Sequence, residues 1–263
     1  MTVFSLALVA VTPVVVGRWL TLDAVLDGVL EADGLEAHER VVPLASWDGN
    51  DMHADVPTSE MAARGLVHVA SALMPFGAVL PLDGDPNGAV LASRRPRVRE
   101  YGMKRGFRPV NDFPDPLMPF ADGRGKPADR IDTKRGPAVS RVETVRCLAP
   151  GRMEWIAQGD PDRVVAILRE AVGIGGKTRK GFGRFDPGSL VVRDLGDRAH
   201  PLAGILAAKG DRLCRPVPAG MFPDGAGASR LSVQTCRSPY WDGSAAEAAR
   251  VPLTRHHDGI FIL

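Results

Sequence analysis

The sequence predicts a mixed α+β domain. Three observations support this: a β-rich apolar run near the start, two later segments with helical apolar spacing, and strand-like runs between them. The chain has 263 residues, 44% of them hydrophobic, which is enough for one large domain or a domain with a sizeable insertion. Its 29 Gly and 22 Pro favour turns and long loops over a helical bundle.

The first elements follow from apolar spacing. Residues 3–11 predict a strand, and residues 20–30 predict an amphipathic helix. Thr21 or Asp23 is the expected cap of that helix. Residues 35–61 have no clean period and are predicted to be loop.

The second half repeats strands and a helix. Residues 66–80 predict one or two strands, and residues 142–159 predict two more, joined at Ala149-Pro150-Gly151. Asp160 or Asp162 then caps a second helix. A short last strand follows a glycine-rich loop and ends near residue 192. The apolar face of the second helix is expected to comprise Val164, Val165, Ile167, Leu168 and Val172.

The resulting order is strand-helix-strand, insertion, strand-strand-helix-strand. It fits a ferredoxin-like or RNA-recognition-motif-like α+β fold, and we expect a single domain over residues 1–263. Residues 93–141 are rich in Pro, Gly and Arg and too long for a plain connection, so they predict an extended or partly mobile basic insertion. Residues 195–263 predict an extension of irregular structure and short strands packed on the core.

Basic residues gather in segments 94–108, 124–146 and 177–184, which hold 18 basic and 4 acidic residues, a balance of +14. The rest of the chain holds 15 basic and 27 acidic residues, a balance of −12, so the net charge of +2 conceals the division. One charged run is usually a solvated surface. Three runs of one sign in Gly/Pro-rich segments favour a nucleic acid as partner.

The strongest local pattern is GIGGKTRKGFGR, residues 173–184. Glycine lets backbone N–H groups approach a phosphate without a Cβ in the way, and the Lys and Arg side chains supply counter-charge. The loop is therefore predicted to bind a sugar-phosphate backbone, with RNA favoured. Phe182 either stacks on a base or anchors the loop in the core, and we favour the anchor. A Gly-rich turn with incidental charges stays the alternative.

A nucleotide-binding enzyme with a phosphate loop is a further hypothesis, because Gly176-Lys177-Thr178 matches the end of that motif. The motif also needs a glycine where this chain has Ala171. It needs a strand before the loop and a helix after it, and the predicted order here has the helix first. The sequence therefore disfavours this hypothesis.

The spacing Gly173-Ile-Gly175, five residues, Gly181-Phe-Gly183 resembles the glycine-rich motif of the RAMP superfamily of CRISPR-associated proteins. The N-terminal strand, the PVVVG turn and the helix beginning LTLDAVLDGVL are also similar to those proteins. Within the superfamily, the layout looks like the Cas "five" family, whose members bind the 5′ handle of the guide RNA, and like type IV systems in particular.

The resemblance covers residues 1–30, 64–80 and 142–192. It implies a non-catalytic subunit that caps a CRISPR effector complex in antiviral or anti-plasmid defence. The implied partners are CRISPR RNA, the backbone and large subunits and, indirectly, target DNA. The basic insertion would be a thumb that kinks the RNA. The expected RNA-binding residues are Gly173, Gly175, Gly176, Lys177, Thr178, Arg179, Lys180, Gly181, Gly183, Arg184, Arg94, Arg95, Arg97, Arg99, Tyr101, Lys104, Arg105, Arg108, Lys134 and Arg135.

An endoribonuclease that processes precursor CRISPR RNA is the alternative within the superfamily, with His as general acid or base. No histidine spacing identifies a catalytic pair, although Tyr101 beside Lys104 could assist phosphodiester chemistry. We expect no catalytic residue, metal or cofactor. The histidines are His38, His53, His68, His200, His256 and His257, of which His68 fits a structural role in a strand.

Cysteine usage and hydropathy indicate a cytoplasmic protein. Cys147, Cys214 and Cys236 match no zinc spacing and are expected to be free thiols. The apolar run Val3–Val16 is only 14 residues long and contains Pro13, so it is too short to span a bilayer. No basic segment precedes it, as a signal peptide would require. We therefore expect no membrane partner.

Overall fold

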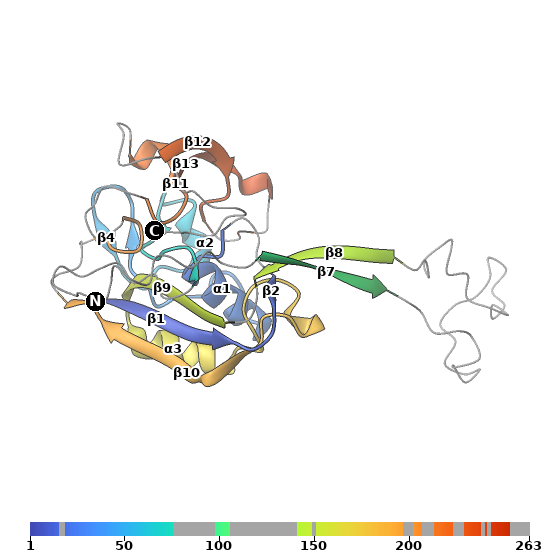
Figure 1. Cartoon of the computed structure of the whole chain (residues 1–263). Helices are drawn as coiled ribbons and strands as arrows, with labels where there is room; N and C mark the ends of the chain where they lie inside the picture. Colours follow the sequence, from blue (N-terminus) through green and yellow to red (C-terminus); the bar gives the residue numbers. More distant parts are fainter. Residues whose placement is uncertain are drawn as a thin grey trace, which may run out of the picture. The chain divides into compact units, whose positions relative to one another are not determined.

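The computed structural model describes residues 1–15, 19–75, 98–105, 141–148, 151–196, 202–206, 213–222, 229–237, 240 and 243–252. The chain divides into two compact units, Met1–Arg97 with Leu148–Leu263, and Val98–Cys147. Small antiparallel sheets and few helices make up the described part, which confirms the mixed α+β class (Figure 1).

The largest sheet of the first unit has four strands in the order β10-β1-β9-β6. They are β10 (Phe185–Asp194), β1 (Thr2–Ala10), β9 (Gly151–Gly159) and β6 (Met74–Pro75), and every neighbouring pair is antiparallel. The predicted strands at 3–11 and in 151–159 are confirmed. β1 lies between two neighbours and its residues 4–8 are all buried, which accounts for its almost continuous apolar sequence.

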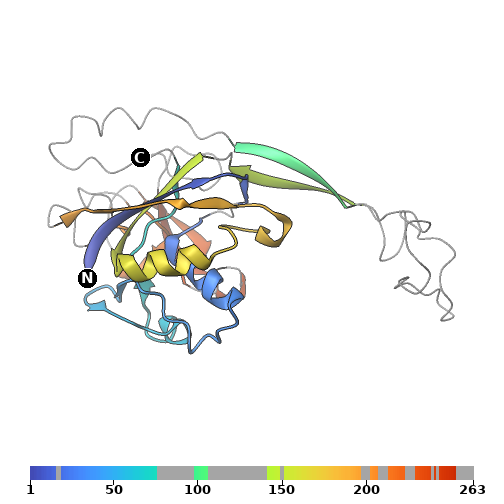
Figure 2. The ribbon, with the colours of Figure 1, turned by 90° about the horizontal axis from the view of Figure 1, so that it is seen from below.

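Two helices lie side by side on one face of this sheet (Figure 2). α1 (Leu22–Ala32) confirms the first predicted helix; Thr21 occupies its N-cap position, but no side-chain hydrogen bond caps it. α3 (Pro161–Glu170) is capped as predicted by Asp160, whose carboxylate accepts hydrogen bonds from two backbone N–H groups. The predicted apolar face of α3 was too wide, because Val172 lies beyond the helix end and is exposed.

The loop prediction for residues 35–61 was wrong in part. This segment contains β3 (Ser46–Trp47), β4 (Met52–His53) and α2 (Thr58–Met61), and β3 also pairs with β5 (Val67–His68). Strands of two residues are too short to show a period of two, so the pattern that identifies longer strands could not reveal them.

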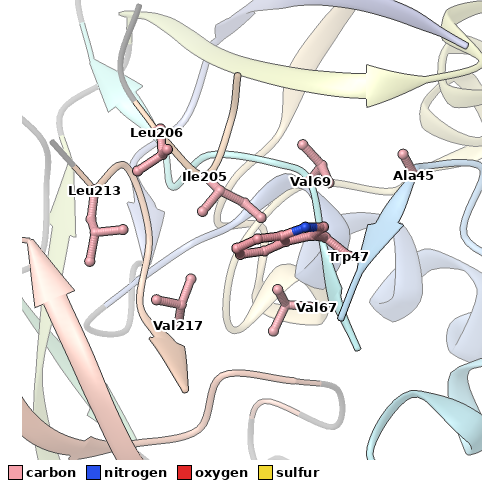
Figure 3. Packing of buried hydrophobic residues seen from close by; sticks show 8 residues of the cluster. All are labelled: Ala45, Trp47, Val67, Val69, Ile205, Leu206, Leu213 and Val217. Atoms are coloured by element: carbon pink, nitrogen blue, oxygen red, sulfur yellow. The ribbon is translucent and has the colours of Figure 1, made fainter. Parts of the chain in front are cut away.

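A third sheet in the order β11-β13-β12 is built from β11 (Val217–Pro218), β12 (Ser229–Gln234) and β13 (Glu247–Pro252). Residues before and within it close a buried cluster around the Trp47 ring (Figure 3). Segments far apart in the chain thus share one core. The cluster comprises Ala45, Trp47, Val67, Val69, Ile205, Leu206, Leu213 and Val217.

The shorter elements complete the description. β2 (Val14–Val15) precedes α1, and single turns of 3-10 helix cover Thr178–Lys180, Ala219–Met221 and Gly243–Ala245. In the second unit, β7 (Val98–Arg105) lies beside β8 (Arg141–Leu148) in one sheet (Figure 1).

None of the helices in the described segments is long and apolar enough to cross a membrane.

Glu154 on β9 is expected to make the stability of the fold depend on pH. Its side chain is 1% exposed, and Arg152 Nη2 lies 3.9 Å from its Oε1. Burial raises the pKa of Glu154, and the opposing effects of Arg152 and Arg193 do not cancel it. Between the pKa of Glu154 in the unfolded chain and its higher pKa in the folded protein, the folded state binds more protons than the unfolded state. The free energy of unfolding therefore falls as pH rises through that window.

We expect Glu154→Gln to remove this decline. Relative to the wild-type protein, the free energy of unfolding of the variant should rise as pH increases through the window. Below the window, Glu154 is protonated in both the folded and the unfolded wild-type protein, so the difference between the two proteins should be constant. Urea unfolding at a series of pH values measures the difference. An offset that stays constant across all pH values would contradict the assignment.

Candidate nucleic-acid interface

The glycine loop connects α3 to β10 and is fixed at its base by backbone hydrogen bonds. Ile174 N donates to Gly183 O at 2.9 Å, which closes the loop on itself. Gly183 N donates to Pro13 O and Gly176 N donates to Val15 O, both at 2.8 Å. The base of the loop is therefore held against the segment that leaves β1.

The glycines of this base serve close backbone packing. A Cβ at Gly183, where φ is +69°, would lie 1.9 Å from Ile174 O. A Cβ at Gly175, where φ is +77°, would lie 2.4 Å from Val15 O. Several loop N–H groups are thus already bonded within the protein, so these two glycines are needed for the loop's shape rather than for direct approach to a phosphate.

Ile174 anchors the loop in the core, because its side chain is only 1% exposed. Phe182, on the returning arm beside the 3-10 turn, is half-buried. The expectation that Phe182 also anchors the loop stays a prediction.

The tip of the loop presents basic side chains on a single 3-10 turn, Thr178–Lys180. Lys177 precedes the turn with φ +59°, and Gly181 ends it with φ +85°. Arg179, Lys180 and Arg184 are exposed, whereas Lys177 and Thr178 are half-buried. A fixed base with cationic side chains at its tip is an arrangement suited to holding an anionic backbone at low entropic cost.

The order of elements around the loop excludes the phosphate-loop motif here. α3 comes before the loop and β10 comes after it, the reverse of the strand-loop-helix arrangement in which a helix N-terminus faces the phosphates. Lys177 and Thr178 therefore do not occupy the positions of a nucleotide-binding lysine and threonine.

The basic insertion is only partly described. Arg99, Tyr101, Lys104 and Arg105 belong to β7, which places them on one extended strand. The other expected RNA-binding residues of this region lie outside the described residues: Arg94, Arg95, Arg97, Arg108, Lys134 and Arg135.

The sequence reasoning missed a fully buried ion pair between Asp23 and Arg215. Arg215 Nη1 is 3.1 Å from Asp23 Oδ1, and both side chains are 0% exposed. The guanidinium also donates to the backbone oxygens of His68, Ala70 and Cys236. The network joins α1 to the C-terminal segment.

Tyr240 completes the network, because its hydroxyl donates to Asp23 and accepts from Arg215. Burial raises the pKa of Tyr240 well above its usual range, so the hydroxyl stays protonated. Burial alone would lower the pKa of Arg215, but Asp23 and Tyr240 outweigh that effect and raise it. The one available signal was an aspartate between Leu22 and Ala24 on an otherwise apolar helix start.

The described histidines do not form an acid-base pair. His68 is buried in β5, where its Nδ1 lies 3.0 Å from Ser46 Oγ, and burial lowers its pKa. His53 lies within hydrogen-bonding distance of Asp48 and Arg64. His200, His256 and His257 lie outside the described residues.

Within the described segments, no group of three or more His, Cys, Asp or Glu could hold a metal ion.

No family model matches this chain, and no curated protein matches it either.

Proposed function

We propose that this chain binds single-stranded RNA through the glycine loop. The observation that carries the proposal is the loop itself, a fixed backbone hairpin whose tip exposes Arg179 and Lys180. Contact with a backbone rather than with base edges is what such side chains on a short turn provide. The strong basic charge of the segment from residue 94 onward supports a longer RNA path.

We further propose that the four-stranded sheet and its helices form a ferredoxin-like domain. The support is the strand order β10-β1-β9-β6, with α1 following β1 and α3 connecting β9 to β10, which is the arrangement of a split βαβ fold. The glycine pattern lies before the last strand of this sheet, as the resemblance to RAMP proteins requires.

The particular role proposed is that of a guide-RNA-binding, non-catalytic subunit of a CRISPR effector complex, of the Cas "five" type. The glycine loop would hold the 5′ handle and the basic insertion would direct the strand onward. Backbone and large subunits would be its protein partners, and target DNA would be met only through the guide.

The loop cations give the direct test. Changing Lys177, Arg179 and Lys180 together to Ala should weaken binding of a 12-nucleotide RNA regardless of its sequence. The log–log salt slope should fall by about 0.7 for each phosphate that the variant no longer neutralises. Fluorescence anisotropy at several salt concentrations measures both. An unchanged slope would refute the proposed site.

A matched control is the triple change of Arg64, Arg163 and Arg193 to Ala, which removes the same charge from exposed positions outside the loop. It should leave the slope within error of the wild-type value.

Incubating the wild-type protein with CRISPR repeat RNA and no divalent metal tests the endoribonuclease alternative. Cleavage would support that alternative, and intact RNA would oppose it.

A further inference from the structure

β12 forms one edge of the sheet β11-β13-β12. All six of its residues, Ser229–Gln234, pair with β13 in a regular antiparallel register. Among the described strands, none pairs with the other side of β12. The backbone N–H and C=O groups that point away from β13 can therefore accept a further strand.

The edge of β12 lacks the proline residues and bulges with which soluble proteins often block such pairing. The edge strand β10 of the larger sheet has both features. Its Pro187 has no backbone N–H to donate, and its register with β1 shifts between Ala7 and Val9. β12 contains no proline and no glycine, and its register with β13 does not shift. Of these two edges, β12 is therefore the one that is open to extension.

One face of the β12 edge is apolar and exposed. Leu231 is 68% exposed and Val233 is 69% exposed, and because they are two residues apart they lie on the same face of the sheet. Ala248, which is opposite Val233 on β13, is exposed as well. A single exposed apolar side chain is an ordinary surface feature. Two of them on an unblocked edge strand are the pattern of a site for strand pairing.

The other face of β12 is polar. Arg230 is exposed, and Gln234 Nε2 donates a hydrogen bond to Ser232 Oγ at 3.1 Å. Gln234 and Ser232 therefore share a face, as the alternation of side chains along a strand requires. β12 thus presents an apolar row and a polar row to any strand that pairs with it.

A second copy of β12 matches both rows. In an antiparallel pair with a two-fold axis at Ser232, Leu231 of each copy is opposite Val233 of the other. On the polar face, Ser232 is opposite its own copy. Arg230 is opposite Gln234, whose side-chain oxygen can accept a hydrogen bond from the guanidinium. This register therefore pairs apolar with apolar and polar with polar side chains, and it opposes no like charges.

The neighbouring registers match less well. With the axis at Leu231, Val233 of each copy would be opposite Ser229 of the other. With the axis at Val233, Leu231 would be opposite Thr235. Each shift leaves an apolar side chain opposite a hydroxyl, so the sequence of β12 favours the axis at Ser232.

We infer that β12 pairs with β12 of a second copy of this chain, which joins two three-stranded sheets into one continuous sheet. The contact is short, Arg230–Gln234 of each copy, so the dimer should be weak and dependent on protein concentration. The inference does not rest on the proposed RNA binding, because the cations of the glycine loop take no part in the contact.

Sedimentation of the purified, nucleic-acid-free protein over a wide range of concentrations gives the test. The wild-type protein should show a reversible monomer–dimer equilibrium. Leu231→Lys/Val233→Lys should weaken dimerisation at least about tenfold, because it removes the apolar cross-strand pairs. Both side chains are exposed in the monomer, so the variant should fold, and circular dichroism checks this. The matched control is Val191→Lys/Val192→Lys on β10, which also replaces two exposed apolar residues of an edge strand and should leave dimerisation unchanged.

Single cysteines test the register. Ser232→Cys places two thiols directly across the two-fold axis, where mild oxidation can join them in a disulfide. Leu231→Cys, which is opposite Val233 of the other copy, should cross-link far less. The wild-type protein gives the background from its native cysteines, of which Cys214 and Cys236 are buried.

A wild-type protein that stays monomeric at every concentration would overturn the inference and leave the edge to a strand of another protein. A dimer that Leu231→Lys/Val233→Lys leaves intact would also overturn it, as would a dimer that the control on β10 dissociates equally. Equal cross-linking of Ser232→Cys and Leu231→Cys would contradict a two-fold axis at Ser232. These results leave the proposed RNA binding untouched, since that is measured with different variants.

Discussion

Asp23→Ala is expected to lower the free energy of unfolding by about 3–5 kcal/mol, because it leaves the Arg215 guanidinium buried without its counter-ion. The guanidinium cannot shed its charge, since arginine stays protonated under all ordinary conditions. The change also removes an acceptor for the Tyr240 hydroxyl. Urea unfolding followed by circular dichroism measures the loss.

The control is an exposed ion pair. Glu60 Oε2 lies 3.4 Å from Arg64 Nη1 on the protein surface, and Glu60→Ala should cost less than about 1 kcal/mol. The double variant Asp23→Ala/Arg215→Met should recover part of the stability, because no buried charge remains. Recovery should be incomplete, since the backbone oxygens of His68, Ala70 and Cys236 lose their donor. An Asp23→Ala loss as small as that of Glu60→Ala would contradict the buried network.

Gly183→Ala is expected to destabilise the protein by about 3–5 kcal/mol. The new Cβ would lie 1.9 Å from Ile174 O, so the two arms of the loop must separate, and the residue would also have to hold φ +69°. Because Ile174 N donates to Gly183 O, separating the arms breaks the bond that closes the loop. The decrease in stability is measured by thermal and urea unfolding.

Gly181→Ala is the matched control, because Gly181 has a similar φ of +85° but an added Cβ would meet no atom within 4 Å. Only backbone strain remains there, and the expected cost is about 1–2 kcal/mol. Equal destabilisation at both positions would show that conformational strain, and not the contact with Ile174, makes Gly183 necessary.

The elements that the sequence predicted correctly are those with a local sequence pattern. The second helix was found because Asp160 or Asp162 marks its start and residues at helical apolar spacing follow, and both signals act within a few residues. β1 was found because its residues 4–8 are all buried, so its sequence is almost continuously apolar. The strands β3 and β4 were missed because two-residue strands show no period of their own and are defined only by their pairing.

The sequence predicted where the glycine loop lies, but not the physical role of its glycines. The glycine spacing located the loop, yet three-dimensional proximity to Val15 and Ile174 explains why Gly175 and Gly183 are glycines. Asp23 and Arg215 are 192 positions apart, so no local pattern could connect them.

The cluster around Trp47 has a consequence for synthesis of the chain. Half of its members lie between residues 45 and 69 and half between 205 and 217. A ribosome that adds about 5–20 residues per second needs roughly 7–30 s to reach the second half. During that interval the Trp47 ring and its neighbours lack their partners. The nascent chain therefore presents an apolar surface to holding chaperones, and the core closes only after the C-terminal segment emerges.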